Sequence, residues 1–231
     1  MELSRDEIKN ENIRKTAKKL TDMMTSEEKI YQTLNSTPPI ERLGINGYDW
    51  WNEGLHGVAR AGLATVFPQA IGLAATWDET LAEHVADAVS TEARAKYNMQ
   101  QRMDDTGRYK GLTLWAPNIN IFRDPRWGRG HETYGEDPYL TSRMGIRFIE
   151  GLQGHDENYL KSAACVKHFA VHSGPEGLRH EFNAVVSKKD MYDTYLPAFK
   201  ACIQEAHVEA VMGAYNRTNG EPCCGSHTLL I

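Results

Sequence analysis

Short apolar runs, each followed at once by polar side chains, recur along this 231-residue chain. The runs occupy residues 45–52, 112–116, 162–166 and 208–214, and the polar residues after them are Glu53 with His56, a long set from Asn118 onward, Lys167 with His168, and Tyr215 with Asn216. Patterns typical of helices separate the runs, and this alternation predicts parallel βα units. In such folds, side chains at the carboxyl ends of the strands meet at one face. The polar sets are therefore expected to converge.

Helix signals are clearest in the first half of the chain. Residues 13–34 are expected to be helical with a restart at Thr25, because Thr25 and Glu28 form a capping-box pattern. Residues 78–97 carry alanine, valine and leucine at the spacing of one helix face, which predicts an amphipathic helix.

Two further helices are predicted in the second half. Residues 139–151 are apolar at helical spacing, and Asp137 followed by Pro138 suits a helix start. Ser187 caps another helix, in which Pro197 should cause a kink or a split because proline removes a backbone donor.

Two architectures fit alternating strands and helices. An open doubly wound sheet would also place polar groups after its strands. The sequence has no glycine-rich phosphate fingerprint, so the barrel is preferred. The expectation is an α/β fold of the (β/α)8 TIM-barrel type that is incomplete at the C-terminus, with roughly six of the ~8 strands of that fold.

Composition excludes several classes of protein. Hydrophobic residues make up 41% and charged residues 25%, which is typical of globular domains. A net charge of −5 without a basic block argues against a nucleic-acid partner. No apolar run approaches the ~20 residues of a membrane span, and the polar N-terminus lacks a signal-peptide core. The four irregularly spaced cysteines are interpreted as free thiols, and a cytoplasmic location is expected.

The segment from residue 112 to residue 138 joins a strand to a helix through an unusually long polar loop. It holds three arginines among acids, with aromatic residues between them. Loops of this length in compact domains are usually functional or disordered. Arginines held by acids suit a site that grips hydroxyl groups. A salt-bridged surface loop is the competing interpretation.

Six motifs together resemble the N-terminal barrel domain of glycoside hydrolase family 3, the β-glucosidase and β-xylosidase family. They are residues 48–56 (YDWWNEGLH), 67–69 (FPQ), 124–129 (DPRWGR), 132–138 (ETYGEDP), 167–169 (KHF) and 214–220 (AYNRTNG). The resemblance runs from about Thr25 to the end. It implies that residues 1–231 are a partial barrel domain, with residues 1–24 as an N-terminal helical extension.

The resemblance implies an exo-acting glycosidase that removes terminal β-linked xylose or glucose with retention of configuration. Its partners would be a β-linked oligosaccharide or aryl glycoside, and no cofactor or metal is implied. Glu53 stands where glucosidases of the family usually have Asp, and the WNE version resembles the xylosidase branch. The residues that match sugar-binding positions are Glu53, Arg129, Lys167, His168, Tyr215 and, less closely, Arg179.

The sequence departs from the family pattern at the nucleophile. That residue is an Asp in a Ser-Asp-Trp or Ser-Asp-Cys motif, and neither motif occurs here. The chain reaches Ile231 in an apolar run. We therefore expect a fragment that lacks the nucleophile, the acid/base and the C-terminal domain, and that is inactive alone.

Two other functions remain open. A β-N-acetylglucosaminidase of the same family would use His172 as acid/base, although that branch normally has Pro and Gly where this chain has Ala170 and Val171. A carbohydrate-binding remnant without catalysis is the second. His168 and His172, with Glu176 and His180, could suggest a metal site, but Gly174 and Pro175 argue against the helix that such spacing needs.

Four loop residues and two tryptophans have expected roles of their own. Glu132 and Asp137 are expected to hold Arg126 and Arg129 rather than to act in catalysis. Of the adjacent tryptophans at 50 and 51, one is expected in the core and one near the pocket, since tryptophan suits both cores and sugar faces.

Overall fold

Three parallel strands lie at the centre of the computed structural model, which describes residues 5–231 and the side chains of residues 11–231. The strands are β3 (Thr113–Leu114), β4 (Ala163–Phe169) and β6 (Ala210–Gly213), in the order β3-β4-β6. Thr113 pairs with Ala163 and Cys165 pairs with Ala210. Parallel bridges from Asn52 to Leu114 and from Asn118 to Lys167 extend this arrangement. The carboxyl ends of these segments therefore share one edge.

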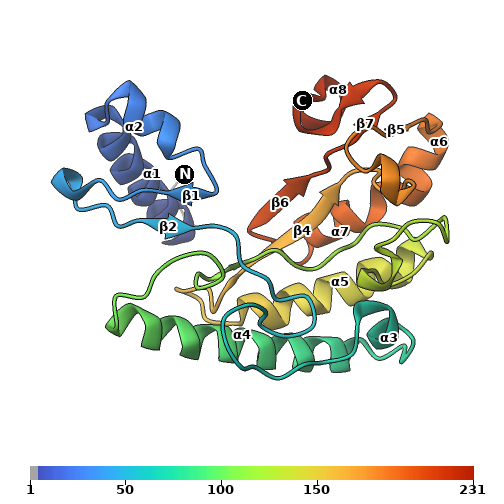
Figure 1. Cartoon of the computed structure of the whole chain (residues 1–231), viewed down its shortest axis with the longest axis horizontal. Coiled ribbons are helices and arrows are strands. Elements are labelled where there is room, and N and C mark those ends of the chain that lie inside the picture. The colour runs from blue at the N-terminus through green and yellow to red at the C-terminus, as the bar shows by residue number, and fades with distance from the viewer. Residues whose placement is uncertain (1–4) are drawn as a thin grey trace.

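Two long helices cover one side of the strands (Figure 1). α4 (Glu79–Arg102) and α5 (Pro138–Gln153) lie side by side. Asp78 caps α4 by accepting from the backbone N–H of Leu81, and Asp137 does the same for Leu140. The predicted helices at 78–97 and 139–151 are thus confirmed, with ends a few residues later.

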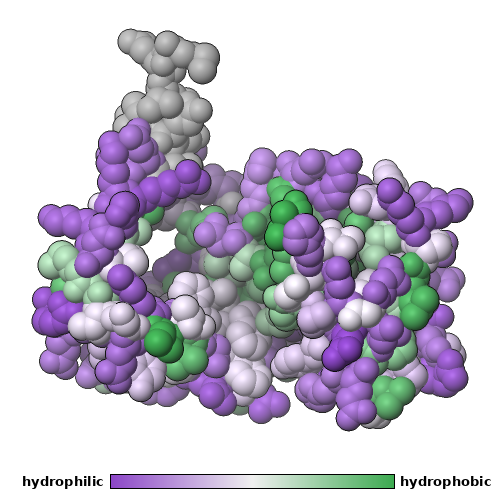
Figure 2. All heavy atoms as spheres, turned by 90° about the horizontal axis from the view of Figure 1, so that it is seen from above, coloured by the Kyte–Doolittle hydropathy of each residue, from purple (hydrophilic) through white to green (hydrophobic). Residues whose placement is uncertain are grey.

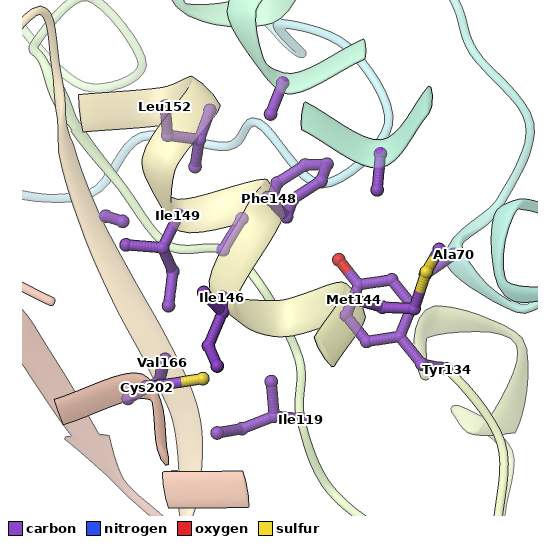
Figure 3. Close-up of a cluster of buried hydrophobic side chains, with 14 of the residues drawn as sticks. Ala70, Ile119, Tyr134, Met144, Ile146, Phe148, Ile149, Leu152, Val166 and Cys202 are labelled. Atoms are coloured by element: carbon purple, nitrogen blue, oxygen red, sulfur yellow. The ribbon is translucent and has the colours of Figure 1, made fainter. Parts of the chain in front are cut away.

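The main hydrophobic core lies between these helices and the strands (Figure 3). Phe148 and Ile149 of α5 are buried, and Val166 of β4 packs in the same cluster. Cys202 reaches the cluster from α7 (Pro197–Gln204), and α3 (Ala70–Ala74) covers another part of it. Side chains of the strands are anchored in this core. The core therefore holds the polar ends of the strands in position.

The N-terminal part forms a separate group of elements, on the left of Figure 1. α1 (Arg5–Met23) and α2 (Ser26–Tyr31) precede an antiparallel pair of β1 (Ser36–Thr37) and β2 (Tyr48–Asp49), with a turn η1 (Glu41–Leu43) between the strands. The capping box at Thr25 is present in both directions, as predicted. Residues 1–4 of the expected N-terminal extension lie outside the described residues.

Shorter elements complete the chain. They are the turns η2 (Gly130–Glu132), η3 (Glu176–Leu178) and η5 (Cys223–Gly225), the strands β5 (Asn183–Ala184), β7 (Arg217–Thr218) and β8 (Glu221–Pro222), and the helices α6 (Lys188–Asp190) and α8 (His227–Leu230). A π-helical turn η4 (Met191–Tyr195) separates α6 from α7, which begins at Pro197. The predicted split at this proline is confirmed.

The fold is α/β, but the described residues do not contain the roughly six parallel strands expected of the barrel. Within the run at 45–52, Tyr48–Asp49 form the antiparallel strand β2, and Asn52 makes a single bridge to β3. β7 pairs in parallel with β5 and in an antiparallel way with β8, in a second three-stranded sheet. The short pairs β1–β2 and β7–β8 satisfy backbone donors in hairpins, which periodicity does not reveal.

Polar residues cover most of the face seen in Figure 2, and apolar residues form small separate groups on it. None of the helices within residues 5–231 is both long and apolar enough to cross a lipid bilayer.

The close approach of α4 and α5 depends on Gly151, and this generates a test. A methyl group at Gly151 would overlap the carbonyl oxygen of Glu83 and approach the Ala86 side chain to 2.8 Å. We expect Gly151→Ala to lower the free energy of unfolding by about 1–3 kcal/mol, as overpacked sites do. Urea denaturation monitored by circular dichroism measures the change.

Gly72→Ala in α3 is the matched control. A methyl group there would meet only the Pro68 side chain at 3.6 Å, an ordinary contact. This substitution should therefore be neutral or stabilise by roughly 0.5–1 kcal/mol through helix propensity. Equal effects of the two substitutions would contradict the role of Gly151 in helix packing.

Candidate functional site

Lys167 lies near the end of β4 with only 4% of its surface exposed. Its Nζ is 4.0 Å from Oε2 of Glu53, which follows the first apolar run. Burial lowers the pKa of Lys167, and Arg129 acts in the same direction while Glu53 opposes it. The indole N–H of Trp51 donates to Oε1 of Glu53 at 2.9 Å. Segments more than a hundred residues apart thus meet in one ion pair.

His168 is held in one tautomer by Asn120. The Asn120 amide nitrogen donates to the carbonyl oxygens of His168 and Ala170, at 2.9 and 3.1 Å, so its Oδ1 must be the acceptor. That oxygen accepts from the backbone N–H and from Nδ1 of His168, at 2.8 and 3.0 Å. Burial, with Lys167 next, holds the pKa of His168 well below its ordinary value. The imidazole is therefore neutral, with its lone pair on Nε2.

Arg129 donates a hydrogen bond to that lone pair. Its Nη1 lies 3.1 Å from Nε2 of His168, and its Nε donates to Glu132 at 2.6 Å. Burial alone would lower the pKa of Arg129, but the bond to Glu132 outweighs burial and raises it. Burial alone would raise the pKa of Glu132, but the bond to Arg129 outweighs burial and lowers it. The pair is therefore charged, and it holds the guanidinium in place.

His172 lies beside this group with 3% of its surface exposed. Its ring centroid is 4.6 Å from that of His168. Nδ1 lies 3.0 Å from Oδ1 of Asn216, whose amide nitrogen donates to the carbonyl oxygens of Val171 and Arg217. Burial lowers the pKa of His172 as well. Its Nε2 is buried and has no hydrogen-bond partner among the described residues.

The two remaining predicted residues have other partners. Arg179 pairs with Glu176, and its charge is among those that lower the pKa values of His168 and His172. Tyr215 is 64% exposed and packs on His180 with ring centroids 4.8 Å apart. The structure thus brings Glu53, Arg129, Lys167 and His168 into contact, with Arg179 nearby, and places Tyr215 on the exposed side.

Several neighbours of the site were not identified from the sequence. Asn120 and Asn216 lie in polar sets that the sequence singled out, but their role in fixing the histidines was not predicted. Trp115 stacks on Trp51 at a centroid distance of 5.1 Å. The long polar loop alone did not reveal this second aromatic layer behind Glu53.

Two expectations about individual residues are wrong in part. Trp50 is 45% exposed and Trp51 is half-buried beside Glu53, so neither is a plain core residue. Glu132 holds Arg129 as expected.

The other acid, Asp137, caps α5 instead of holding an arginine. Arg126 pairs with Asp124, two residues away, because a carboxylate so close in sequence reaches it without loop rearrangement. Among residues 11–231, no group of three or more histidine, cysteine or acidic side chains is arranged to hold a metal ion.

Comparison with known proteins gives a consistent set of relatives. The family model for the glycosyl hydrolase family 3 N-terminal domain matches residues 41–231. Xylan 1,4-beta-xylosidase of Xylanibacter ruminicola is 50% identical over 227 residues, which is 96% of this chain and 26% of that protein. Probable beta-D-xylosidase 7 of Arabidopsis thaliana is 44% identical over 94% of this chain and 30% of its own length.

Solved structures of similar enzymes also superimpose on this chain. A GH3 exo-beta-xylosidase (XlnD), solved with a xylobiose aziridine probe, superimposes with a TM-score of 0.81 and 35% identity, covering 91% of this chain and 28% of that one. A beta-glucosidase from Kluyveromyces marxianus in complex with glucose gives a TM-score of 0.77 and 32% identity, over 93% and 25% of the two chains. The chain thus spans less than a third of the length of these relatives.

The two buried neutral histidines predict how stability depends on pH. In the unfolded chain, His168 and His172 regain ordinary pKa values near ~6.5, so below that pH the unfolded state binds more protons than the folded state. The free energy of unfolding should therefore fall as the pH is lowered from about 6.5 towards about 5. The slope should approach ~1.4 kcal/mol per pH unit from His168, whose pKa lies well below its ordinary value, and His172 should add to it in the same direction.

Urea denaturation at a series of pH values measures this slope. His168→Asn should make it shallower, and His155→Asn, at an exposed histidine, serves as the control for histidine substitution. Stability that stays constant over the interval would show that the buried imidazoles are not neutral in the folded protein.

Proposed function

The chain belongs to glycosyl hydrolase family 3, and from this premise we propose that it holds the terminal sugar of a β-linked xyloside or glucoside as part of an exo-acting glycosidase. Curated relatives that align over 91–96% of this chain are named as β-xylosidases. They are much longer than the chain, so the activity proposed is that of an enzyme of their length. We propose residues 1–231 as a partial N-terminal barrel domain, with residues 1–24 as an extension.

The observation that carries the proposal is the contact group of Glu53, Arg129, Lys167 and His168. It presents ammonium and guanidinium donors next to a carboxylate that accepts. A ring hydroxyl both donates and accepts, so it suits a site where both kinds of group are fixed. Tyr215 and Arg179 are proposed to border the same sugar.

Xylose is the sugar that we favour. Glu53 is held by the Trp51 indole, and this WNE sequence resembles the xylosidase branch. Curated relatives named as xylosidases are 43–50% identical to this chain. Among solved structures, the exo-beta-xylosidase at 35% identity and a TM-score of 0.81 stands only slightly above the β-glucosidases at 28–34% identity. The names of the curated relatives therefore support a xyloside as the substrate class.

The proposed reaction is a retaining double displacement. Such enzymes place a nucleophile and an acid/base about 5–5.5 Å apart. We propose that both come from residues that this sequence does not contain, since neither Ser-Asp-Trp nor Ser-Asp-Cys occurs in it. The residues present would strengthen their hold on the hydroxyls as the ring flattens towards the transition state. Lys167 would also favour an ionised nucleophile beside it.

The rival function with His172 as acid/base has less support. Its Nδ1 proton is committed to Asn216, and burial lowers its pKa. A general acid needs a pKa near the working pH, so a neutral buried imidazole is poorly suited to protonate a leaving group. Sugar binding without catalysis by the isolated chain is consistent with the proposal.

Binding and turnover by the 231-residue chain test the proposal. Methyl β-xyloside should bind in isothermal titration calorimetry, and Glu53→Gln or Lys167→Met should weaken binding roughly tenfold or more by removing charge-assisted hydrogen bonds. Lys189→Met, at an exposed lysine paired with Asp193, is the matched control. A nitrophenyl β-xyloside should not be hydrolysed, since loss of a nucleophile costs on the order of 10⁶-fold in other enzymes.

The outcomes separate the alternatives. Failure to bind xyloside would contradict the proposed role of the site. Turnover that disappears in His172→Asn would replace it with the acid/base role of His172. In an enzyme of the relatives' length with the same residues, Lys167→Ala should depress turnover strongly.

A further inference from the structure

His168 and His172 are held in the same way. An asparagine anchors its amide nitrogen on two backbone carbonyl oxygens and offers Oδ1 to Nδ1 of the histidine, Asn120 for His168 and Asn216 for His172. Both imidazoles therefore carry their proton on Nδ1 and a lone pair on Nε2.

Two arginine–glutamate pairs of the same spacing border the histidines. Arg129 pairs with Glu132, three residues away across the turn η2, and Arg179 pairs with Glu176 across the turn η3. In the first set, the arginine completes the network by donating to Nε2 of His168.

The second set is incomplete. Nε2 of His172 and Nε of Arg179 are both buried, and neither has a hydrogen-bond partner among the described residues. The two groups belong to one neighbourhood: Trp127 packs on His172 with ring centroids 5.8 Å apart, the adjacent Gly128 lies against the Glu176 side chain, and Glu176 pairs with Arg179. A buried acceptor and a buried donor without partners each carry a desolvation cost, which a ligand can remove.

The chemistry of the pair selects one kind of ligand group. A carboxylate cannot donate to the lone pair of Nε2. An ammonium could donate there but would be repelled by Arg129, Arg179 and Lys167. A hydroxyl donates to Nε2 and accepts from an arginine N–H at the same time. A sugar hydroxyl thus satisfies both groups with one atom.

We propose that His172 is a further substrate-binding residue, and that one hydroxyl of the sugar lies between its Nε2 and Nε of Arg179. This inference rests on the proposed function, because it places the same sugar against a second histidine. Both atoms are closed to solvent. The Arg179 side chain, 32% exposed and paired with Glu176, must shift to admit the hydroxyl.

Nitrogen NMR of the chain with ¹⁵N-labelled histidine tests this directly. On titration with methyl β-xyloside, the Nε2 resonance of His172 should move in the direction of an acceptor that gains a hydrogen bond, and that of His168 should respond as well. A response of His168 without His172 would overturn this inference and leave the proposed function standing. No response from either would contradict both.

Substitutions and deoxy sugars provide the second test. His172→Asn keeps a polar group for Asn216 but none at Nε2, and it should weaken methyl β-xyloside binding about tenfold. His172→Gln, whose amide reaches the Nε2 position, should recover part of the loss. His155→Asn, at an exposed histidine, is the control.

Of the 2-, 3- and 4-deoxy analogues of methyl β-xyloside, one should bind the wild-type chain about tenfold more weakly than methyl β-xyloside itself. The affinity for that analogue should not fall further in His172→Asn. That coupling is absent if His172 only supports the fold, because a structural loss would weaken all analogues alike. Equal losses for all three analogues, or unchanged binding by His172→Asn, would overturn the proposal.

Discussion

The burial of the Lys167 ammonium is the constraint on which the site depends. A lysine with 4% of its surface exposed loses most of its hydration, and an unpaired buried charge costs several kcal/mol. Glu53 supplies the nearest opposite charge at 4.0 Å, and Glu132 also opposes the loss of charge. One acid follows the first apolar run and the other comes from the long loop after β3. Both segments must therefore meet at the carboxyl end of β4.

Asn120 and Asn216 satisfy backbone carbonyl oxygens at the same place. The pairing of β4 with β6 skips His168, and the chain leaves the sheet after Phe169, so the carbonyl oxygens here need other donors. Asn120 supplies them to His168 and Ala170, and Asn216 supplies one to Val171. Because each amide nitrogen is committed to carbonyls, each Oδ1 is left to select the tautomer of a histidine. Backbone satisfaction and the proton positions of the site therefore have the same cause.

Local sequence signals predicted what depends on local physics. The capping box at Thr25, the cap at Asp137 and the break at Pro197 are set by nearest neighbours, and each is present. The convergence of Glu53, Arg129, Lys167 and His168 also followed from their positions after apolar runs, and from the family resemblance.

The features that could not be predicted from the sequence depend on residues that are distant in sequence. The run at 45–52 was expected in the parallel sheet, yet Tyr48 and Asp49 within it pair with Ser36–Thr37 in a hairpin. The clamping role of Asn216 depends on a histidine 44 residues away. The charges of the site show how such long-range pairing limits its ligand. Lys167 faces Glu53, Arg129 holds Glu132 and Arg179 holds Glu176, so each cation already has an acid. A phosphate or carboxylate would have to compete with these acids for the cations. A neutral polyol needs only the donors and acceptors that the pairs leave free, so the pairing itself favours a sugar over an anion.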